Sequence, residues 1–389
     1  MPGTQAIDQV LKDAVTSGQV PGVTAAAANA DGVIHEAAFG RRNLADSAAM
    51  TVDTVFRIAS MTKAITGAAA MQMVEQGKLD LDQNAGDVLP FLAKPMVLDG
   101  FDASGEPKLR PAKGTITLRK LLTHTAGFVY DTWNADMNRY AAKTSLPATR
   151  TGKIAALHAP LGFDPGERWE YGINIDLAGR MVEVASGKDL ETYFQDHLFR
   201  PLGMSDTSFL LQSRWKDRLA RVHARDETGA LNPIDSPAPA ENPEFYPGGG
   251  GLFSTSRDYL TFLRALMHGG ALNGTRILKP GTVALMGQNH MGALNVLPMK
   301  TFNPRMSNDC ELFPGMDKKW GLSFLINTQS VPGARSANSL AWAGINNTYY
   351  WLDPVKNVAG VLMTQILPFA DATVLGVLDR FEQAVYATQ

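Results

Sequence analysis

The chain has 389 residues, 45% of them hydrophobic, so it can bury a large core and hold two domains or one large domain with an insertion. Its net charge of −2 and its lack of any dense Lys/Arg run exclude the electrostatic signature of binding to nucleic acid or to an anionic membrane. No stretch approaches the roughly 18 uncharged apolar residues of a membrane span. We therefore expect a soluble, cytoplasmic protein.

The first part of the chain predicts a helix, a hairpin and a second helix. Residues 1–20 place apolar side chains on one face between charges, which is typical of an amphipathic helix and not of a signal peptide. Residues 23–29 and 33–39 flank an Asn-Ala-Asp-Gly turn and predict a β-hairpin. Residues 60–76 are small and apolar nearly all round, which predicts a buried helix ending at Gly77.

The middle of the chain, residues 79–243, consists of short helical patterns separated by Pro, Gly and Asp, with a polar loop at 99–114. Strand patterns then return, followed by an amphipathic helix at the end of the chain. These strand patterns cover residues 320–327, 340–345, 348–352 and 358–365. Neither they nor the first hairpin would be stable alone, so both are expected in one sheet.

The predicted fold class is therefore α+β, with an antiparallel sheet flanked by helices plus a mainly helical domain. Residues 1–83 and 244–389 are expected to form the sheet domain. Residues 84–243 are expected to form the helical domain, with a cleft where the two domains meet.

Cys310 is the only cysteine, so the chain has no internal disulfide and no zinc site built from cysteines. Its acidic neighbours disfavour a catalytic thiolate, and an inert thiol is expected. The histidines show no His-x-His or His-Glu-x-x-His spacing, so no metal is expected. The best placed of them, His124, has no triad spacing and is expected to be structural.

Ser60 and Lys63 lie three residues apart, so on a helix the Lys63 amine can reach the Ser60 hydroxyl. If burial lowers the pKa of Lys63, the amine can take the proton as Ser60 attacks a carbonyl. A second pair with this spacing, Ser213 and Lys216, lies among charges and is read as accidental. Lys63 instead interrupts an apolar helix, where an ammonium is costly. An N-cap serine with a snorkelling lysine stays open as the alternative.

Further motifs carry a family resemblance. They are FRIASMTK at 56–63, LLTHTAG at 121–127, PGERWEY at 165–171, PLGM at 201–204 and GGGGLFST at 248–255. In order and spacing they resemble the class C β-lactamases and family VIII carboxylesterases over almost the whole chain. The resemblance implies a β-lactamase/transpeptidase-like fold and an acyl-enzyme formed on the serine of the first motif, with no cofactor.

The resemblance also implies the roles of other residues. Tyr171 is the implied third catalytic residue beside Ser60 and Lys63, and which of Tyr171 and Lys63 acts as the base stays open. The backbone amides of Ser60 and Ile345 are the implied oxyanion hole, with Ile345 at the end of an edge strand. The residues expected to line the substrate pocket are Trp342, Ala343, Gly344, Phe128, Tyr130 and Asn174.

Two departures from the family pattern make the pocket more apolar. Trp342 stands where β-lactamases carry a cation for the substrate carboxylate, and Ile173 replaces the usual asparagine after Tyr171, unless Asn174 takes its place. The expected function is therefore that of a carboxylesterase, a serine hydrolase acting on a small-molecule ester. The alternatives are a β-lactamase or amide hydrolase, an acyltransferase of the same fold, and a catalytically silent ligand-binding scaffold.

The glycine run at 248–251 is not followed by the Gly-Lys-Ser/Thr of a phosphate-binding loop. A tight turn leading into a helix capped by Ser254 or Ser256 is expected there.

Overall fold

The computed structural model describes residues 4–389. The helices are α1 (Thr4–Thr16), α2 (Thr62–Glu75), α3 (Leu118–Leu122), α4 (Ala135–Thr144), α5 (Asn174–Ser186), α6 (Leu190–Phe194), α7 (Arg200–Leu202), α8 (Ser256–Met267), α9 (Pro280–Met286) and α10 (Ala372–Tyr386). The strands of the largest sheet are β1 (Gly22–Ala28), β2 (Val33–Gly40), β11 (Lys318–Trp320), β12 (Leu325–Asn327), β13 (Leu340–Gly344), β14 (Thr348–Asp353) and β15 (Val358–Met363). The remaining strands are β3 (Phe56–Arg57), β4 (Met96–Phe101), β5 (Pro107–Pro111), β6 (His223–Arg225), β7 (Leu231–Pro233), β8 (Phe253–Ser254), β9 (Ala271–Leu272), β10 (Thr275–Arg276) and β16 (Ile366–Leu367).

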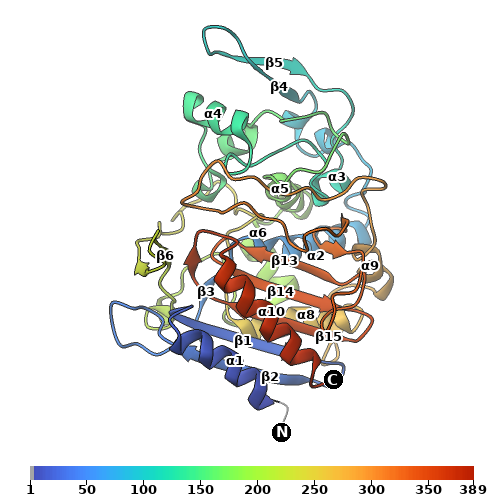
Figure 1. Cartoon of the computed structure of the whole chain (residues 1–389). Helices are drawn as coiled ribbons and strands as arrows, with labels where there is room; N and C mark the ends of the chain where they lie inside the picture. The colour runs from blue at the N-terminus through green and yellow to red at the C-terminus, as the bar shows by residue number, and fades with distance from the viewer. Residues whose placement is uncertain (1–3) are drawn as a thin grey trace.

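Strands from both ends of the chain form one antiparallel sheet, in the order β11-β12-β13-β14-β15-β1-β2 (Figure 1). The two ends join where β1 pairs with β15, with Ala26 opposite Val361. The predicted fold class, an antiparallel sheet flanked by helices, is confirmed, as is the expectation that the first hairpin and the last strands share a sheet.

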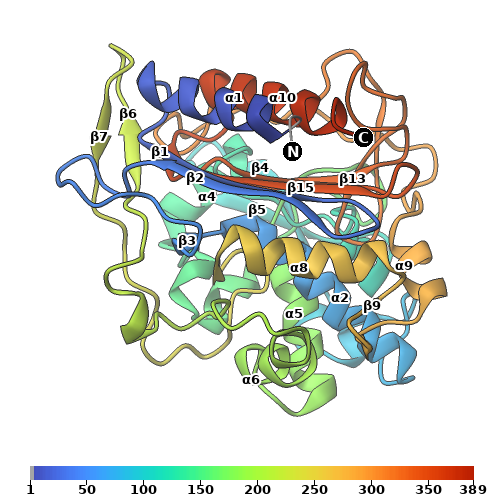
Figure 2. The same cartoon turned by 90° about the horizontal axis from the view of Figure 1, so that it is seen from below.

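Helices cover both faces of this sheet. Seen from below, α1 and α10 lie on one face, and α8 and α2 lie on the other (Figure 2). The strands β1, β14 and β15 are consequently buried along their whole length, and they read as nearly continuous apolar runs. Helix α2 lies between the sheet and the helical part, which explains why its residues are buried on all sides through most of its length.

Residues 96–111 differ from the polar loop expected at 99–114, because β4 and β5 form a hairpin there. The Asp102 carboxylate closes its turn by accepting from the backbone amides of Ser104 (2.8 Å) and Glu106 (2.9 Å). The hairpin lies at the far end of the helical part from the sheet (Figure 1), and its exposure explains its polar sequence. The division into domains at residues 83 and 243 stays a prediction.

The strand expected over residues 320–327 is divided in two. Ser323 adopts a φ of +79°, and the Gly321 amide donates to the Phe324 carbonyl (2.8 Å), so β11 and β12 form a hairpin. The pattern showed only that the whole segment is apolar, and it did not reveal the turn.

Strand β13 is not the edge strand that was expected, because it lies between β12 and β14. However, β12 pairs only with Leu340 and Ala341. The rest of β13, from Trp342 to Gly344, therefore has no strand on that side, and this local edge faces the site described below.

The ends of two helices differ by one or two residues from the prediction. Residues 59–61 form a 3₁₀ turn, η1 (Ala59–Met61), so α2 begins at Thr62 and Ser60 lies in the turn before it. The N-cap of α8 is Thr255, whose hydroxyl accepts from the Asp258 amide (3.1 Å), and not Ser254 or Ser256.

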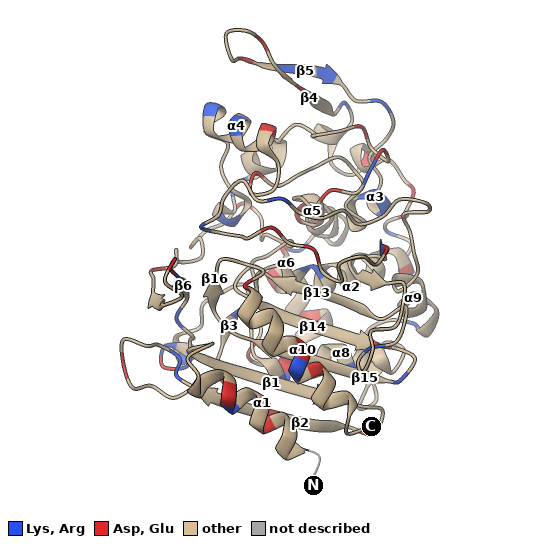
Figure 3. Cartoon of the chain, viewed as in Figure 1, with Lys and Arg blue, Asp and Glu red and all other residues tan. Residues whose placement is uncertain are grey.

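Charged residues of both signs occur throughout the helical part, whereas the central strands of the large sheet carry few (Figure 3). Several charges are paired, for example Arg110 with Asp164 (2.9 Å) and Lys143 with Glu106 (2.7 Å). No helix within residues 4–389 is long and apolar enough to cross a membrane.

Gly360 gives a test of the packing in the sheet. It lies opposite Trp351, and a Cβ at position 360 would meet the indole ring at 2.1 Å. We expect Gly360→Ala to lower the free energy of unfolding by about 1–3 kcal/mol through overpacking. Thermal unfolding followed by circular dichroism measures this, and Trp351→Leu should recover part of the loss.

The matched control is Gly281→Ala in α9, where an added Cβ meets no atom within 4 Å among the described residues. This change should leave the melting temperature unchanged or raise it slightly. Equal melting temperatures for the parent and Gly360→Ala would contradict the packing described here.

Candidate active site

Ser60 lies in η1, between strand β3 and helix α2. Pairing of β3 with β8 and a hydrogen bond from the Ile58 amide to the Leu252 carbonyl (3.1 Å) hold the segment that precedes it. Ala59 adopts a φ of +44°, which is unusual for a residue with a side chain and marks a strained turn. The result is a half-buried serine hydroxyl at the start of a buried helix.

Lys63, one turn further along, is completely buried. Its Nζ donates to the Tyr130 hydroxyl (3.1 Å) and to the Gly249 carbonyl (2.6 Å), and it is hydrogen-bonded to Ser60 Oγ (3.1 Å). Burial lowers the pKa of Lys63 to about 7, while the negative charge of Asp176 acts in the opposite direction. An amine with this pKa is about half neutral near pH 7, and the neutral form can accept the proton of a hydroxyl in contact with it.

Tyr171 completes the group of three. Its hydroxyl accepts a hydrogen bond from Trp342 Nε1 (3.0 Å) and is hydrogen-bonded to Ser60, and the face of its ring lies 4.7 Å from Lys63 Nζ. Burial raises the pKa of Tyr171 well above its ordinary value, in spite of these hydrogen bonds. The phenol therefore stays protonated near neutral pH, and this arrangement favours Lys63 over Tyr171 as the base.

Aromatic rings surround Tyr171. The ring centroids nearest to it belong to His124 (4.8 Å), Trp342 (5.0 Å), Tyr130 (5.1 Å) and Trp133 (5.4 Å). Burial and the nearby Lys63 hold the pKa of His124 well below its ordinary value, so this imidazole is neutral. These rings restrict water around the reacting groups and strengthen electrostatic interactions there.

The expected oxyanion hole brings together two distant parts of the chain. Gly344 at the end of β13 lies so close to the turn before Ser60 that a Cβ would meet the Ile58 carbonyl oxygen at 2.3 Å. Among the backbone hydrogen bonds of residues 4–389 that lie outside helices and strands, none is donated by the Ser60 or Ile345 amide. The oxyanion hole itself stays a prediction.

The predicted pocket residues fall into different environments. Trp342 lines a narrow hollow of about 10 Å³, room for about one water molecule, and Tyr171 is not among the residues that line it. Ala343 is buried and is not among the residues that line this hollow. Phe128 lines a separate groove of about 220 Å³ in the helical part. Tyr130 is closer to the reaction centre than expected, because it contacts Lys63 directly.

Asn174 is placed differently from the expectation that it would meet the substrate. It is completely buried, and its Nδ2 donates to the Phe128 carbonyl (2.9 Å) and lies 3.1 Å from His124 Nδ1. These contacts hold the loop that carries Tyr130 against α5. Its side chain is thus used within the protein.

Sequence reasoning missed two contributors to the site. The glycine run was expected to form only a turn, yet the Gly249 carbonyl is a partner of Lys63. The second is Asp176, a buried carboxylate that interacts with Lys63. Asp176 as the only charged residue in the stretch 171–179 was the available signal. Within residues 4–389, no group of three or more His, Cys, Asp or Glu residues is placed to hold a metal ion.

Comparisons with known proteins agree with this fold. A family profile described as Beta-lactamase matches residues 7–382. The chain is 34% identical to the ML-236A carboxylate methylbutanoyltransferase of Penicillium citrinum, over 98% of this chain and 94% of that one. It is 31% identical to the lovastatin esterase of Penicillium rubens, over 98% of both chains. The solved simvastatin synthase of Aspergillus terreus, at 31% identity, superposes with a TM-score of 0.87 over 100% of this chain and 99% of that one.

Cys310 gives a test of the environment beside Trp342. It is buried and lines the same hollow, and burial, with a contribution from Glu311, raises the pKa of its thiol to about 12. We expect native protein to resist iodoacetamide at pH 8 and the unfolded protein to be alkylated once, because only the thiolate reacts. Mass spectrometry of the intact protein measures both. Rapid, complete alkylation of the native protein would contradict this description.

Proposed function

This chain belongs to the beta-lactamase/transpeptidase-like family of serine hydrolases, and on that premise we propose that it is an acyltransferase that moves a small acyl group from a carboxylic ester to an alcohol. The observation that carries the proposal is the 3.1 Å contact between Lys63 Nζ and Ser60 Oγ inside a buried, aromatic site. The name of the Penicillium citrinum relative, a methylbutanoyltransferase, supports transfer rather than hydrolysis as the proposal for this chain.

The first half of the reaction forms an acyl-enzyme. Ser60 Oγ attacks the ester carbonyl while its proton passes to neutral Lys63, and the developing oxyanion accepts from the amides of Ser60 and Ile345. The tetrahedral intermediate then collapses and the C–O bond to the leaving alcohol breaks. The departing oxygen takes back the proton from Lys63, directly or through the Tyr171 hydroxyl.

The second half repeats these steps with a new nucleophile. The acceptor alcohol gives its proton to Lys63 as its oxygen attacks the acyl carbon, and Ser60 Oγ leaves and recovers a proton. Water reacts in the same way and yields the free acid. The balance between transfer and hydrolysis therefore depends on how well the site admits an alcohol and keeps out water.

The site favours a neutral acyl group. Trp342 contributes an indole beside Tyr171 and no charge. The cation that lines the same hollow, Lys318, is already used, because its Nζ contacts Glu311 (3.3 Å) and the carbonyls of Phe313 (3.2 Å) and Met316 (2.8 Å). The carboxylate of a β-lactam would find no free cation among these residues, so we place β-lactam hydrolysis below acyl transfer.

Ester hydrolysis is the second candidate. The lovastatin esterase of Penicillium rubens matches almost the whole chain, and hydrolysis uses the same acyl-enzyme. The sequence motifs indicated a close relation to the family VIII carboxylesterases, and that relation would favour ester hydrolysis. A catalytically silent scaffold is disfavoured by the intact contacts among Ser60, Lys63 and Tyr171.

Acylation and the fate of the acyl group test both candidates in one experiment. Incubation with p-nitrophenyl butyrate should add one butyryl group at Ser60, detected by mass spectrometry of the intact protein and its peptides. With a primary alcohol present, butyryl ester should form faster than butyric acid. Ser60→Ala should lower the rate of p-nitrophenol release by about 10³-fold or more.

Butyric acid as the sole product at every alcohol concentration would support the esterase instead. Unchanged turnover by Ser60→Ala, or an adduct on another side chain, would overturn both candidates.

The pH dependence of kcat/KM should report the base. Lys63 must be neutral to act, and burial lowers its pKa to about 7, so kcat/KM should fall as the pH drops through about 7. The pKa of Tyr171 is raised, so its phenol should cause no loss of activity on the alkaline side below its ordinary pKa near 10. Initial rates with two esters of different leaving groups measure this. A profile that rises only near pH 10 would identify Tyr171 as the base.

A further inference from the structure

Asp176 is a carboxylate with no role in the reaction described so far. It is the third residue of α5 and is almost completely buried, at 1% exposure. A carboxylate so removed from water is unfavourable unless hydrogen bonds or an opposite charge compensate it. Its surroundings therefore indicate why the fold accommodates it.

Hydrogen bonds to the two backbone polar groups of one residue, Gly249, join Asp176 to Lys63. Asp176 Oδ1 accepts from the Gly249 amide (3.0 Å), and the Gly249 carbonyl accepts from Lys63 Nζ (2.6 Å). A Cβ at position 249 would meet Asp176 Oδ2 at 2.4 Å, so only glycine permits this approach. The carboxylate thus sets the position of the carbonyl that binds the amine.

The second carboxylate oxygen of Asp176, Oδ2, has fewer hydrogen bonds than Oδ1. Within residues 4–389, Asp176 Oδ2 has no hydrogen-bond partner at normal distance, and the Tyr130 hydroxyl is the group that approaches the carboxylate. Tyr130 in turn accepts from Lys63 Nζ. Both partners of Asp176 are therefore also partners of Lys63.

Among the described titratable groups near Lys63, Asp176 is the one that can serve as its negative counterion. The titratable groups near the amine are the hydroxyls of Tyr130 and Tyr171, the neutral imidazole of His124, and Asp176. Burial raises the pKa of both tyrosines, so neither supplies a negative charge near neutral pH.

We propose that Asp176 is a positioning residue for Lys63. The carboxylate of Asp176 fixes the Gly249 carbonyl against the Lys63 amine, and its negative charge favours the protonated form of that amine. This proposal rests on the proposed function only in assigning the proton transfer to Lys63. During the reaction Lys63 carries the proton after taking it from Ser60 and before giving it to the leaving alcohol. Asp176, which does not contact the substrate, stabilises Lys63 in this protonated form.

The pH profile separates charge from hydrogen bonding. Asp176→Asn keeps an oxygen for the Gly249 amide but removes the charge, so the pKa of Lys63 should fall and the acid limb of kcat/KM should move to lower pH by about one unit. Asp176→Ala removes both contacts and should also lower kcat on the plateau. An unmoved limb, or one moved to higher pH, in Asp176→Asn overturns the proposal.

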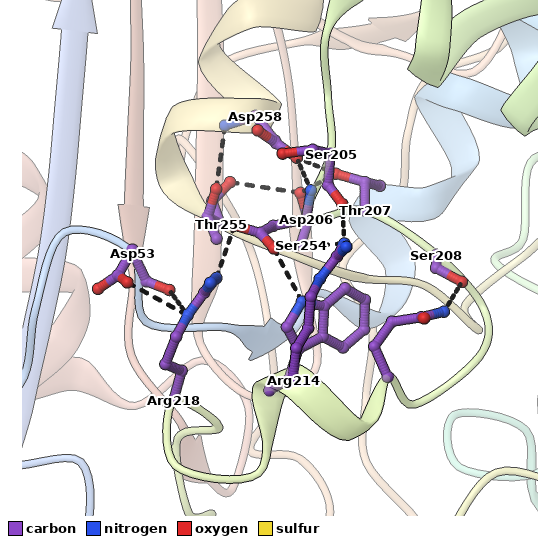
Figure 4. A network of polar contacts seen from close by, with 12 residues as sticks. Asp53, Ser205, Asp206, Thr207, Ser208, Arg214, Arg218, Ser254, Thr255 and Asp258 are labelled. Carbon is purple, nitrogen blue, oxygen red and sulfur yellow. Dashed lines mark hydrogen bonds and ion pairs between the residues drawn. The ribbon is translucent and has the colours of Figure 1, made fainter.

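The matched control is another buried carboxylate that accepts a backbone amide. Asp258 in α8 accepts from the Asp206 amide (2.7 Å) and belongs to a separate network with Thr207 and Thr255 (Figure 4). Its charge is not among those that act on Lys63. Asp258→Asn should leave the acid limb in place, and a shift equal to that of Asp176→Asn would show that the effect is nonspecific.

A stability measurement tests the charge coupling without any catalysis. At pH 6, where the ammonium form of Lys63 prevails, Asp176→Asn should lower the melting temperature of the parent. In a Lys63→Met background the same change should lower it less or raise it, because Asp176 there has no counterion. Equal losses in the two backgrounds overturn the proposal.

These two measurements distinguish its failure from that of the proposed function. If Ser60 is not acylated, the proposed function fails, and the stability cycle still tests the coupling of Asp176 to Lys63. If Asp176→Asn does not fold alone, a folded double variant Lys63→Met/Asp176→Asn still shows that the loss depends on Lys63. A double variant that also fails to fold overturns the proposal.

Discussion

The site depends on keeping the Lys63 amine out of water. In an apolar interior an ammonium is unfavourable, so burial brings the pKa of this group to about 7, where it can exchange protons with a serine. The amine is still held by three partners, Ser60, Tyr130 and Gly249. Only Ser60 is close to Lys63 in sequence, so the tertiary fold supplies the other two partners of the reactive pair.

The fold brings these partners together by letting backbones approach closely at two glycines. At Gly344 the end of β13 meets the turn before Ser60, and at Gly249 a loop reaches the carboxylate of Asp176. A side chain at either position would push apart the elements that form the site. The strained turn at Ala59 belongs to the same arrangement, because the surrounding strands β3 and β8 hold it in place.

The sequence predicts the features that repeat locally. Alternation and turn residues predicted the first hairpin, and the charge-free run after Ser60 predicted a buried helix. Periodicity could not reveal that Asn174 is used within the protein, since its partners Phe128 and His124 are about 50 residues away along the chain. Nor could it reveal the counterion, because burial of a carboxylate depends on elements that meet only after folding.

Acyl transfer and hydrolysis use the same reactive residues. Whether an alcohol or water accepts the acyl group therefore depends more on the side chains that line the site than on the reactive atoms. We propose that in the ligand-free protein at alkaline pH Lys63 is the neutral base and Tyr171 is a phenol. Neutron diffraction from deuterium-exchanged crystals at alkaline pD tests it most directly. We expect two deuterons on Lys63 Nζ and one on the Tyr171 hydroxyl; three on Lys63 with a bare Tyr171 oxygen would contradict the account.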